Sequence, residues 1–376
     1  MSYAGVLAGI TNKKLIIFGT GNTSVDLTQD LGHNISYYVD NDPQKWNGYF
    51  LNARVYPPEQ LLTENPDNIA IVVASHHYLE IAEQLKNMGF SENIHFWNGI
   101  DFNDGRYQKI YLSYPISPKP RYGYGKPPHS KLLKIIDSER ERYQKNLEDF
   151  CSLSAWLKRI SNVEDPTNPV CPYWKNIWLH PLDGISIYSF LALRKPELYL
   201  EVGSGNSTKF ARQAINDHQL ATKIISIDPE PRAEIDRICD QVIREPLEET
   251  DITIFNRLEA GDMVFIDNSH CCYMNSDVTV TFMDVLPYLK KGVLVGFHDI
   301  FLPYDYSPYL IKRFYSEQYL LAAYLLAESN KLRIELPNAY ITRDTELINI
   351  LSPIWDHFKL DPIKKVGYAF WVKIIK

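Results

Sequence analysis

Residues 201–207 combine glycines, small polar side chains and the start of a helix, which together suit a loop that binds an anionic or nucleotide-like ligand. The segment reads Glu-Val-Gly-Ser-Gly-Asn-Ser, after the apolar run 198–200 and before a helical pattern from Thr208 to Asn216. Glycine lets the backbone turn sharply and approach a ligand, and a helix N-terminus offers unpaired N–H groups. Phosphate, dinucleotide and adenosyl ligands all use such loops, so the loop alone does not choose among them.

Three more apolar strands end in polar residues that could do chemistry. The strand 223–227 ends in Asp228-Pro229, at the spacing where a carboxylate accepts the two hydroxyls of a ribose. The next two end in Asp267-Asn268-Ser269-His270 and in His298-Asp299. Open α/β sheets bind ligands at the carboxyl ends of their parallel strands. We therefore expect these side chains and Glu201 to meet at one edge of a sheet.

The segment 198–300 resembles the core of the class I S-adenosylmethionine-dependent methyltransferases, on the strength of this loop and of Asp228. Two further segments, Phe265-Ile266-Asp267-Asn268-Ser269-His270 and His298-Asp299-Ile300-Phe301-Leu302-Pro303, resemble a bacterial subgroup of these enzymes, as does 317–321. The resemblance covers roughly residues 170–376. Ser207 departs from it, because many members have a third glycine there.

The resemblance implies S-adenosyl-L-methionine as cofactor and a small-molecule acceptor, a hydroxyl of a sugar, nucleotide-sugar or natural-product precursor. Gly203, Ser204 and Gly205 would line its methionine part, Asp228 would hold the ribose, and Glu201 would orient the loop or hold the amino group through water. The full cofactor-binding set that we expect is Glu201, Gly203, Ser204, Gly205, Asn206, Ser207, Asp228, Pro229 and Asp267.

Methyl transfer from a sulfonium requires alignment of donor and acceptor and removal of the acceptor's proton. His270 and His298 are candidate bases if their pKa values lie near that of free histidine, and Asp299 completes the expected catalytic set. Alternatively, Asp267, His298 and Asp299 hold a divalent metal that activates the acceptor hydroxyl. A histidine ligand favours manganese, iron or zinc over magnesium. The residues leave both alternatives open.

The elements that must position these residues alternate between strand and helix, which predicts an α/β protein with two Rossmann-like domains. In the second domain we expect strands near 198–202, 223–227, 241–244, 262–267 and 292–297. The resemblance adds a closing antiparallel hairpin, 332–336 with 367–374, and makes a seven-stranded sheet. One polar helix near 131–160, an irregular stretch through Pro181 and a short helix at 345–358 complete the prediction.

The first domain, 1–112, has the same alternation, and a proline-rich linker at 113–130 separates it from the methyltransferase domain, 131–376, with its leading helical segment. It resembles, more weakly, the Rossmann-like module of sugar-modifying transferases in Ile17-Phe18-Gly19-Thr20-Gly21 and in 38–43, with Lys45. Asp40 ends its second strand as a carboxylate of an NAD-binding domain would. Binding of a nucleotide-sugar and a structural or dimerising role, as in a homodimer, both stay open.

Composition limits the alternatives. A net charge of −7 argues against a nucleic-acid partner, and no apolar run reaches the ~18 residues needed to span a membrane. Five cysteines without CxxC spacing fit a reducing compartment, and residues 1–11 lack the apolar core of a signal peptide, so we expect a cytoplasmic protein. The rival functions are an NAD-dependent Rossmann oxidoreductase and a non-catalytic binding or scaffold protein with a degenerate methyltransferase fold.

Overall fold

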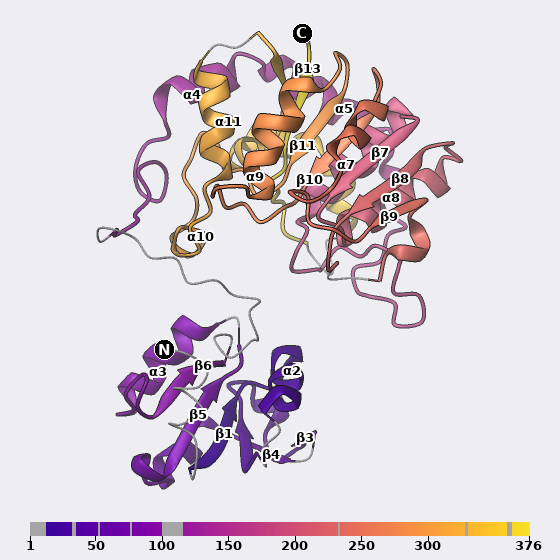
Figure 1. Cartoon of the computed structure of the whole chain (residues 1–376). Helices are drawn as coiled ribbons and strands as arrows, with labels where there is room; N and C mark the ends of the chain where they lie inside the picture. Colours follow the sequence, from indigo (N-terminus) through magenta and orange to yellow (C-terminus); the bar gives the residue numbers. More distant parts are fainter. Residues whose placement is uncertain are drawn as a thin grey trace. The chain divides into compact units, whose positions relative to one another are not determined.

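The computed structural model describes residues 13–31, 35–51, 53–75, 77–99, 116–231, 234–327, 330–358 and 363–376. The chain divides into two compact units, Met1–Ile116 and Ser117–Lys376 (Figure 1). The expected boundary at 112–113 lies outside the described residues. No helix within the described ranges is both long enough and apolar enough to cross a membrane.

The N-terminal unit has a six-stranded sheet in the order β3-β4-β2-β1-β5-β6, parallel except for the β3–β4 pair. Its core strands are short apolar runs with every residue of β5 buried, as expected for a sheet covered on both faces. The elements are β1 Lys14–Phe18, α2 Asn22–Leu31, β2 Tyr37–Val39, β3 Tyr49–Phe50, β4 Ala53–Tyr56, β5 Ile69–Val73, α3 Tyr78–Asn87 and β6 Phe96–Asn98, with 3₁₀ turns at Pro43–Lys45, Pro58–Thr63 and Pro66–Asn68.

The C-terminal unit has a seven-stranded sheet in the order β12-β13-β11-β10-β7-β8-β9 (Figure 1). Its strands are β7 Leu198–Val202, β8 Lys223–Ile227, β9 Gln241–Ile243, β10 Met263–Ile266, β11 Leu294–Phe297, β12 Leu332–Pro337 and β13 Phe370–Ile374. β13 runs antiparallel to the other strands of this sheet and pairs with both β11 and β12. The predicted seven-stranded sheet with its closing hairpin is confirmed, and this is the class I methyltransferase fold.

The register of this sheet explains why the chemical residues meet. Val202, the last residue of β7, pairs with Ile227 of β8 and with Ile266 of β10. Ile266 in turn pairs with Phe297 of β11. The residues that follow these four strands therefore start level with one another at one edge of the sheet.

Helices flank the sheet and separate it from solvent. They are α4 Ser130–Asp137, α5 Arg140–Cys151, α6 Ser154–Leu157, α7 Pro181–Arg194, α8 Asn206–Asp217, α9 Asp277–Val280, α10 Pro308–Lys312, α11 Glu317–Leu326, α12 Asn338–Arg343, α13 Thr345–Ile350 and α14 Ser352–Trp355, with a π-helical turn at Thr281–Val285 and 3₁₀ turns at Asp236–Ile238, Ile252–Arg257, Leu286–Tyr288 and Asp356–Phe358. Helix α7 packs along α8 and is buried along almost its whole length.

Two helix predictions and one prediction of irregular structure were wrong. The segment 131–160 forms three helices, because Ser138 and Ser152 bond back to Ile135 and Asp149 carbonyls and compete with helix continuation. The segment 345–358 is divided because Pro353 cannot donate to the preceding turn.

The third wrong prediction concerns Pro181, which does not lie in an irregular stretch. It occupies the first turn of α7, where a proline loses no hydrogen bond.

Candidate active site

Gly203 sits where the backbone of the loop crosses the end of β10. Its φ is +75°, and a Cβ atom there would lie 1.7 Å from the carbonyl oxygen of Asp267. Its N–H donates to Ile227 O at 2.9 Å, and the Asp267 N–H donates to Val202 O at 2.8 Å. Only glycine fits this crossing, and the loop is thereby held between the ends of β8 and β10.

Glu201 is fully buried beneath the loop and holds its shape. Its carboxylate accepts hydrogen bonds from Tyr199 Oη at 2.9 Å and from the Thr208 hydroxyl. That hydroxyl in turn accepts the Gly205 N–H at 3.0 Å. Burial raises the pKa of Glu201 to about 7. Of the two predicted roles for Glu201, the contacts favour orientation of the loop.

Asp228 joins the loop to the end of β8. Its carboxylate accepts the backbone N–H of Ser204 at 2.7 Å and that of Glu230 at 2.8 Å. The Ser204 hydroxyl also bonds the Ser226 hydroxyl at 2.7 Å. Two backbone donors orient this carboxylate, and each of its oxygens keeps a lone pair for a ligand hydroxyl.

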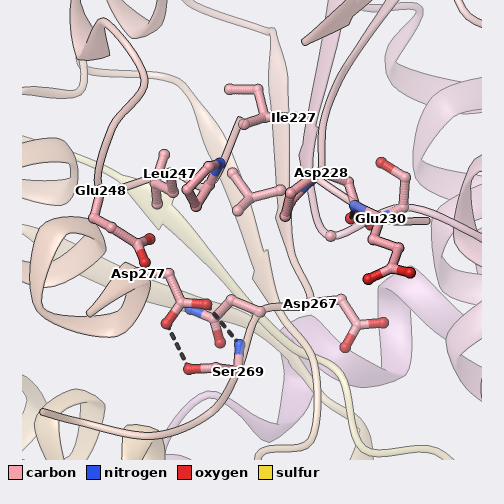
Figure 2. A pocket seen from close by; sticks show the side chains of 14 residues that line it. Ile227, Asp228, Glu230, Leu247, Glu248, Asp267, Ser269 and Asp277 are labelled. Atoms are coloured by element: carbon pink, nitrogen blue, oxygen red, sulfur yellow. Dashed lines mark hydrogen bonds between the residues drawn. The ribbon is translucent and has the colours of Figure 1, made fainter. Parts of the chain in front are cut away.

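A cavity of about 330 Å³ opens at this edge of the sheet (Figure 2). Five of the predicted cofactor residues line it, namely Gly203, Ser204, Asp228, Pro229 and Asp267. Glu201, Gly205, Asn206 and Ser207 are not among its lining residues, and they lie behind the loop or in the first turn of α8.

The other lining residues are Val202, Ile227, Glu230, Pro246, Leu247, Glu248, Asn268, Ser269 and Asp277. Sequence reasoning missed the segment 246–248, which follows the short third strand β9. The only signal was Pro246, two residues after a predicted strand, and that signal is weak. Asp277 orients Ser269 by accepting its N–H at 2.8 Å and its hydroxyl at 2.6 Å.

His270 lies beside the cavity among three carboxylates, of which Glu317 is fully buried and Asp267 and Asp299 are partly exposed. Its Nδ1 is 2.8 Å from Glu317 Oε2, and its Nε2 is 3.4 Å from Asp267 Oδ1 and 3.8 Å from Asp299 Oδ2. Burial opposes the charged ring, but the hydrogen bonds with Asp267 and Glu317 and the charges of Glu317 and Asp299 raise the pKa of His270 to about 10. At neutral pH the ring therefore carries a proton on both nitrogens.

His270 also fixes the position of α11. Its backbone is left-handed, with φ +59°, and its carbonyl accepts the N–H groups of Ser316 and Glu317 at 2.7 and 3.1 Å. These bonds satisfy free donors at the start of the helix and place the Glu317 carboxylate against the His270 ring. Glu317 belongs to a segment quoted above for its resemblance, but sequence reasoning gave it no role.

His298 is the second buried ring of the cluster, with only 3% of its surface exposed. Its Nδ1 is 3.0 Å from Asp267 Oδ1, and its Nε2 is 3.5 Å from Asp183 Oδ2. Burial opposes the charge of this ring as well, but the charges of Asp267 and Asp299 raise its pKa well above the ordinary value. The sequence-based expectation was a pKa near that of free histidine for both rings, whereas in the structure both pKa values are raised.

The structure brings together most of the residues predicted for catalysis or a metal. Asp267 contacts both histidines, whereas Asp299 approaches His270 rather than His298. Among the described residues, two groups place ligand atoms close enough to share a metal ion, Asp267 with His270 and His298, and His180 with Asp183 and His298. Sequence reasoning missed His180 and Asp183, because the start of α7 was not predicted.

In the N-terminal unit, Asp40 is already bonded within the chain. Its carboxylate accepts the Thr20 hydroxyl, the Asp42 N–H at 2.9 Å and the Lys45 ammonium at 3.0 Å. Burial opposes ionisation, but these hydrogen bonds lower the pKa of Asp40. A carboxylate that binds ribose hydroxyls must be free to accept them, and Asp40 instead accepts bonds from its own chain.

Residues 200–300 match the family model described as "Methyltransferase domain", and residues 11–94 match the model "C2185-like, N-terminal". A search of curated proteins finds no match. With this match, the sheet order and the cavity, the C-terminal unit contains a methyltransferase domain.

Solved structures similar to this chain include three methyltransferases. SAH-bound PaMTH1 of Podospora anserina is 15% identical over 65% of this chain and 96% of that chain, with a TM-score of 0.34. The O-methyltransferase TomG from Streptomyces achromogenes, in complex with SAM, is 13% identical over 54% of this chain and 83% of that chain, with a TM-score of 0.28. The O-methyltransferase from Bacillus cereus, in complex with SAH, is 12% identical over 62% of this chain and 91% of that chain, with a TM-score of 0.27.

Proposed function

We propose that the C-terminal unit transfers a methyl group from S-adenosyl-L-methionine to a hydroxyl of a small polar acceptor, with the acceptor bound beside His270, His298 and Asp299. The observation that carries the proposal is the position of Asp267. Its carboxylate lines the cavity and also bonds His298 Nδ1 at 3.0 Å. The cofactor cavity and the buried histidine cluster therefore meet at one side chain.

The cavity residues fit the cofactor by type. Asp228 offers an oriented carboxylate for the ribose hydroxyls, as the sequence predicts. The apolar side chains Ile227 and Leu247, with Pro246, offer a surface for an adenine ring. Gly203 and Ser204 also line the cavity, and Gly203 lies against the main chain of Asp267. Bound there, the cofactor would supply an electrophilic methyl group on a sulfonium.

The remaining chemistry falls to the chain's own side chains. A histidine that already carries a proton at neutral pH cannot accept one from the substrate. We therefore propose that the Asp299 carboxylate, which lies 3.8 Å from His270 Nε2, is the base that removes the acceptor's proton. His270 then acts as a donor that orients the acceptor oxygen and offsets the negative charge that develops on it.

Binding of a product analogue tests the cofactor assignment. Asp228→Asn should weaken S-adenosylhomocysteine binding, measured by calorimetry on the full chain, by roughly 10- to 100-fold, because a charge-assisted hydrogen bond contributes about 1.5–3 kcal/mol. Asp284→Asn, at an exposed position outside the cavity, is the matched control. Equal affinities of the two variants would refute the role of Asp228.

Turnover tests the catalytic assignment. A panel of polyhydroxylated acceptors, read by mass spectrometry for a gain of one methyl group, should identify a substrate class. Asp299→Asn should then retain S-adenosylhomocysteine binding and lose turnover. Full activity of this variant on the identified acceptor would refute the base.

The most specific form of the acceptor proposal is that the N-terminal unit binds a nucleotide-sugar. The bonds that Thr20 and Lys45 make to Asp40 favour a structural role for that carboxylate. A nucleotide would therefore have to bind through other groups, and calorimetry with uridine diphosphate tests whether it binds at all. Sedimentation equilibrium tests the homodimer.

A further inference from the structure

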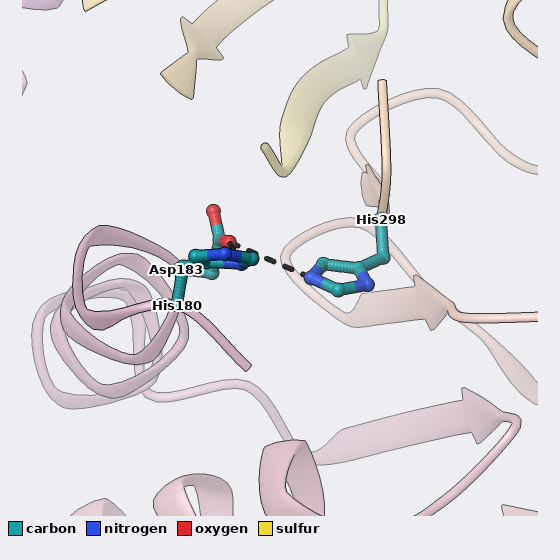
Figure 3. A group of neighbouring side chains, drawn as sticks. All are labelled: His180, Asp183 and His298. Carbon is teal, nitrogen blue, oxygen red and sulfur yellow. Dashed lines mark ion pairs between the residues drawn. The ribbon is translucent and has the colours of Figure 1, made fainter. Parts of the chain in front are cut away.

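A second group of side chains lies beside the cofactor cavity, outside its lining. His180 and Asp183 come from the start of α7, and His298 follows β11 (Figure 3). Asp183 Oδ2 lies 3.5 Å from His298 Nε2 and 4.0 Å from His180 Nδ1. The three atoms converge on one point from two elements far apart in the sequence.

Two nitrogens of this group are buried without a hydrogen-bond partner in the part of the chain that the structure describes. They are His298 Nε2 and His180 Nδ1. The His298 ring is 3% exposed, and the His180 side chain makes no capping hydrogen bond although it occupies the N-cap position of α7. A buried polar atom without a partner costs about 1–3 kcal/mol. A ligand between the two rings would remove this cost.

The Asp183 carboxylate is fixed by its other bonds. Its Oδ1 accepts the Asn338 amide at 2.7 Å and the N–H groups of Tyr368 and Ala369 at 2.8 and 2.7 Å. Its Oδ2 accepts a longer bond from Tyr368 N at 3.0 Å. These bonds join α7 to the segment before β13 and leave Oδ2 facing the two rings.

The spacing and chemistry of these atoms suit a transition-metal ion. Zinc binds nitrogen and carboxylate oxygen at about 2.0–2.1 Å, which places tetrahedral ligands roughly 3.4 Å apart. The distances of 3.5 and 4.0 Å from Asp183 Oδ2 need only small side-chain movements to reach that value. His298 also has the partner that metal-binding histidines usually have, because its other nitrogen bonds the Asp267 carboxylate.

We infer that His180, Asp183 and His298 form a binding site for a divalent transition metal, with zinc as the best fit to two imidazoles and one carboxylate. Of the metal ligands predicted from sequence, this site keeps His298 alone and moves Asp267 to a supporting position. The second group, Asp267 with His270 and His298, is a weaker candidate, because His298 Nδ1 and His270 Nδ1 are already bonded to Asp267 and Glu317.

Three protein ligands leave a fourth position for a water or a hydroxyl. If the proposed function is correct, that position lies on the acceptor side of Asp267, and the ion would lower the pKa of an acceptor hydroxyl bound there. This use rests on the proposed function, whereas the metal site itself does not.

Metal binding to the full chain tests the site. The protein is stripped with a chelator, and Zn²⁺ is titrated by calorimetry in a competing buffer, with Co²⁺ absorption as a second readout of ligand geometry. We expect one ion per chain. His180→Ala and His298→Ala should each weaken binding by roughly 100-fold or more, since loss of even a supporting residue costs 10- to 100-fold. His357→Ala, at an exposed position, should bind as the unaltered chain does.

The outcomes separate this inference from the proposed function. Affinity in His180→Ala equal to that of His357→Ala, or no stoichiometric ion in the unaltered chain, would overturn the site. Loss in His270→Ala without loss in His180→Ala would assign the ion to the other group and equally overturn it. S-adenosylhomocysteine binding is measured in the same samples, so its failure would count against the methyltransferase assignment and leave the metal result unaffected. His180→Asn provides a second variant if His180→Ala fails to fold.

Discussion

Glu201 should make the C-terminal unit less stable as the pH rises, and Glu201→Gln should remove this dependence. The carboxyl group is fully buried between Tyr199 and Thr208. Its pKa, ordinarily 4.5, is raised to about 7 by burial. The folded chain therefore binds this proton more tightly than the unfolded chain, and stability falls where the unfolded chain alone has lost the proton.

The size of the effect follows from the two pKa values. A rise from 4.5 to about 7 corresponds to about 3 kcal/mol of unfolding free energy. This contribution is present below pH 4.5 and is lost progressively as the pH rises to 7. Glutamine has the shape of the protonated acid and does not ionise. The stability of Glu201→Gln relative to the unaltered chain should therefore increase by about 3 kcal/mol between pH 4.5 and pH 8.

Urea denaturation at a series of pH values measures this difference. The chain has two units, so the transition to follow is the one that S-adenosylhomocysteine shifts to higher urea. Glu197→Gln, one residue before β7, is at an exposed position and serves as the control. Its stability relative to the unaltered chain should not change with pH. Parallel curves for Glu201→Gln and the unaltered chain across this range would refute the argument that burial sets the pKa.

Two further predictions concern the loop and the histidine cluster. Gly203→Ala should abolish S-adenosylhomocysteine binding and lower the melting temperature, because the added Cβ would lie 1.7 Å from the Asp267 carbonyl oxygen. Gly21→Ala, which has open space around it, is the control and should change neither quantity. Similar behaviour of the two variants would contradict the close approach of Gly203 to Asp267. Glu317→Gln should lower stability by roughly 3–5 kcal/mol at pH 7 by removing a partner of the buried His270 charge. The pKa of His270 is raised from 6.5 to about 10, so the stabilising effect of its charge is full below pH 6.5 and is lost as the pH rises through 10. In urea denaturation, the loss of unfolding free energy in Glu317→Gln should therefore become smaller toward pH 10. A loss that does not change with pH would contradict the charged pair of His270 and Glu317.

Much of the C-terminal sheet could be predicted because its strands are short apolar runs, each followed by glycine or acidic residues. Local sequence determines those features, so the strand at 198–202 was found directly, whereas Asn206 and Ser207 of the predicted loop begin α8. The predicted strand ends at 262–267 and 292–297 were too long by one or two residues, since apolar patterns do not show where pairing stops.

The helical predictions at 131–160 and 345–358 failed for a related reason. There the boundaries depend on serine bonds back to the main chain and on one proline, and not on the hydrophobic period.

The site was predictable only on the side that the strands supply. Asp228, Asp267 and His298 follow apolar strands, and that pattern is visible in the sequence. Asp183 and Glu317 reach the same region from helices, at positions that only tertiary packing determines. Glu317 also changes its partner, since it helps to keep on His270 a proton that free histidine would lose. The sequence could not show this change, because a pKa depends on neighbours that are distant in the chain.

The register of the sheet gives Asp267 its central place. Ile266 pairs with Val202 on one side and with Phe297 on the other, so Asp267 follows its strand level with Gly203 and His298. The Asp267 carbonyl closes on Gly203, and its carboxylate lines the cavity and bonds His298. Side chains alternate between the faces of a strand, so a shift of one residue in β10 would remove these contacts together. Cofactor loop, cavity and histidine cluster therefore depend on one strand register, and a substitution that disturbs the end of β10 should affect all three at once.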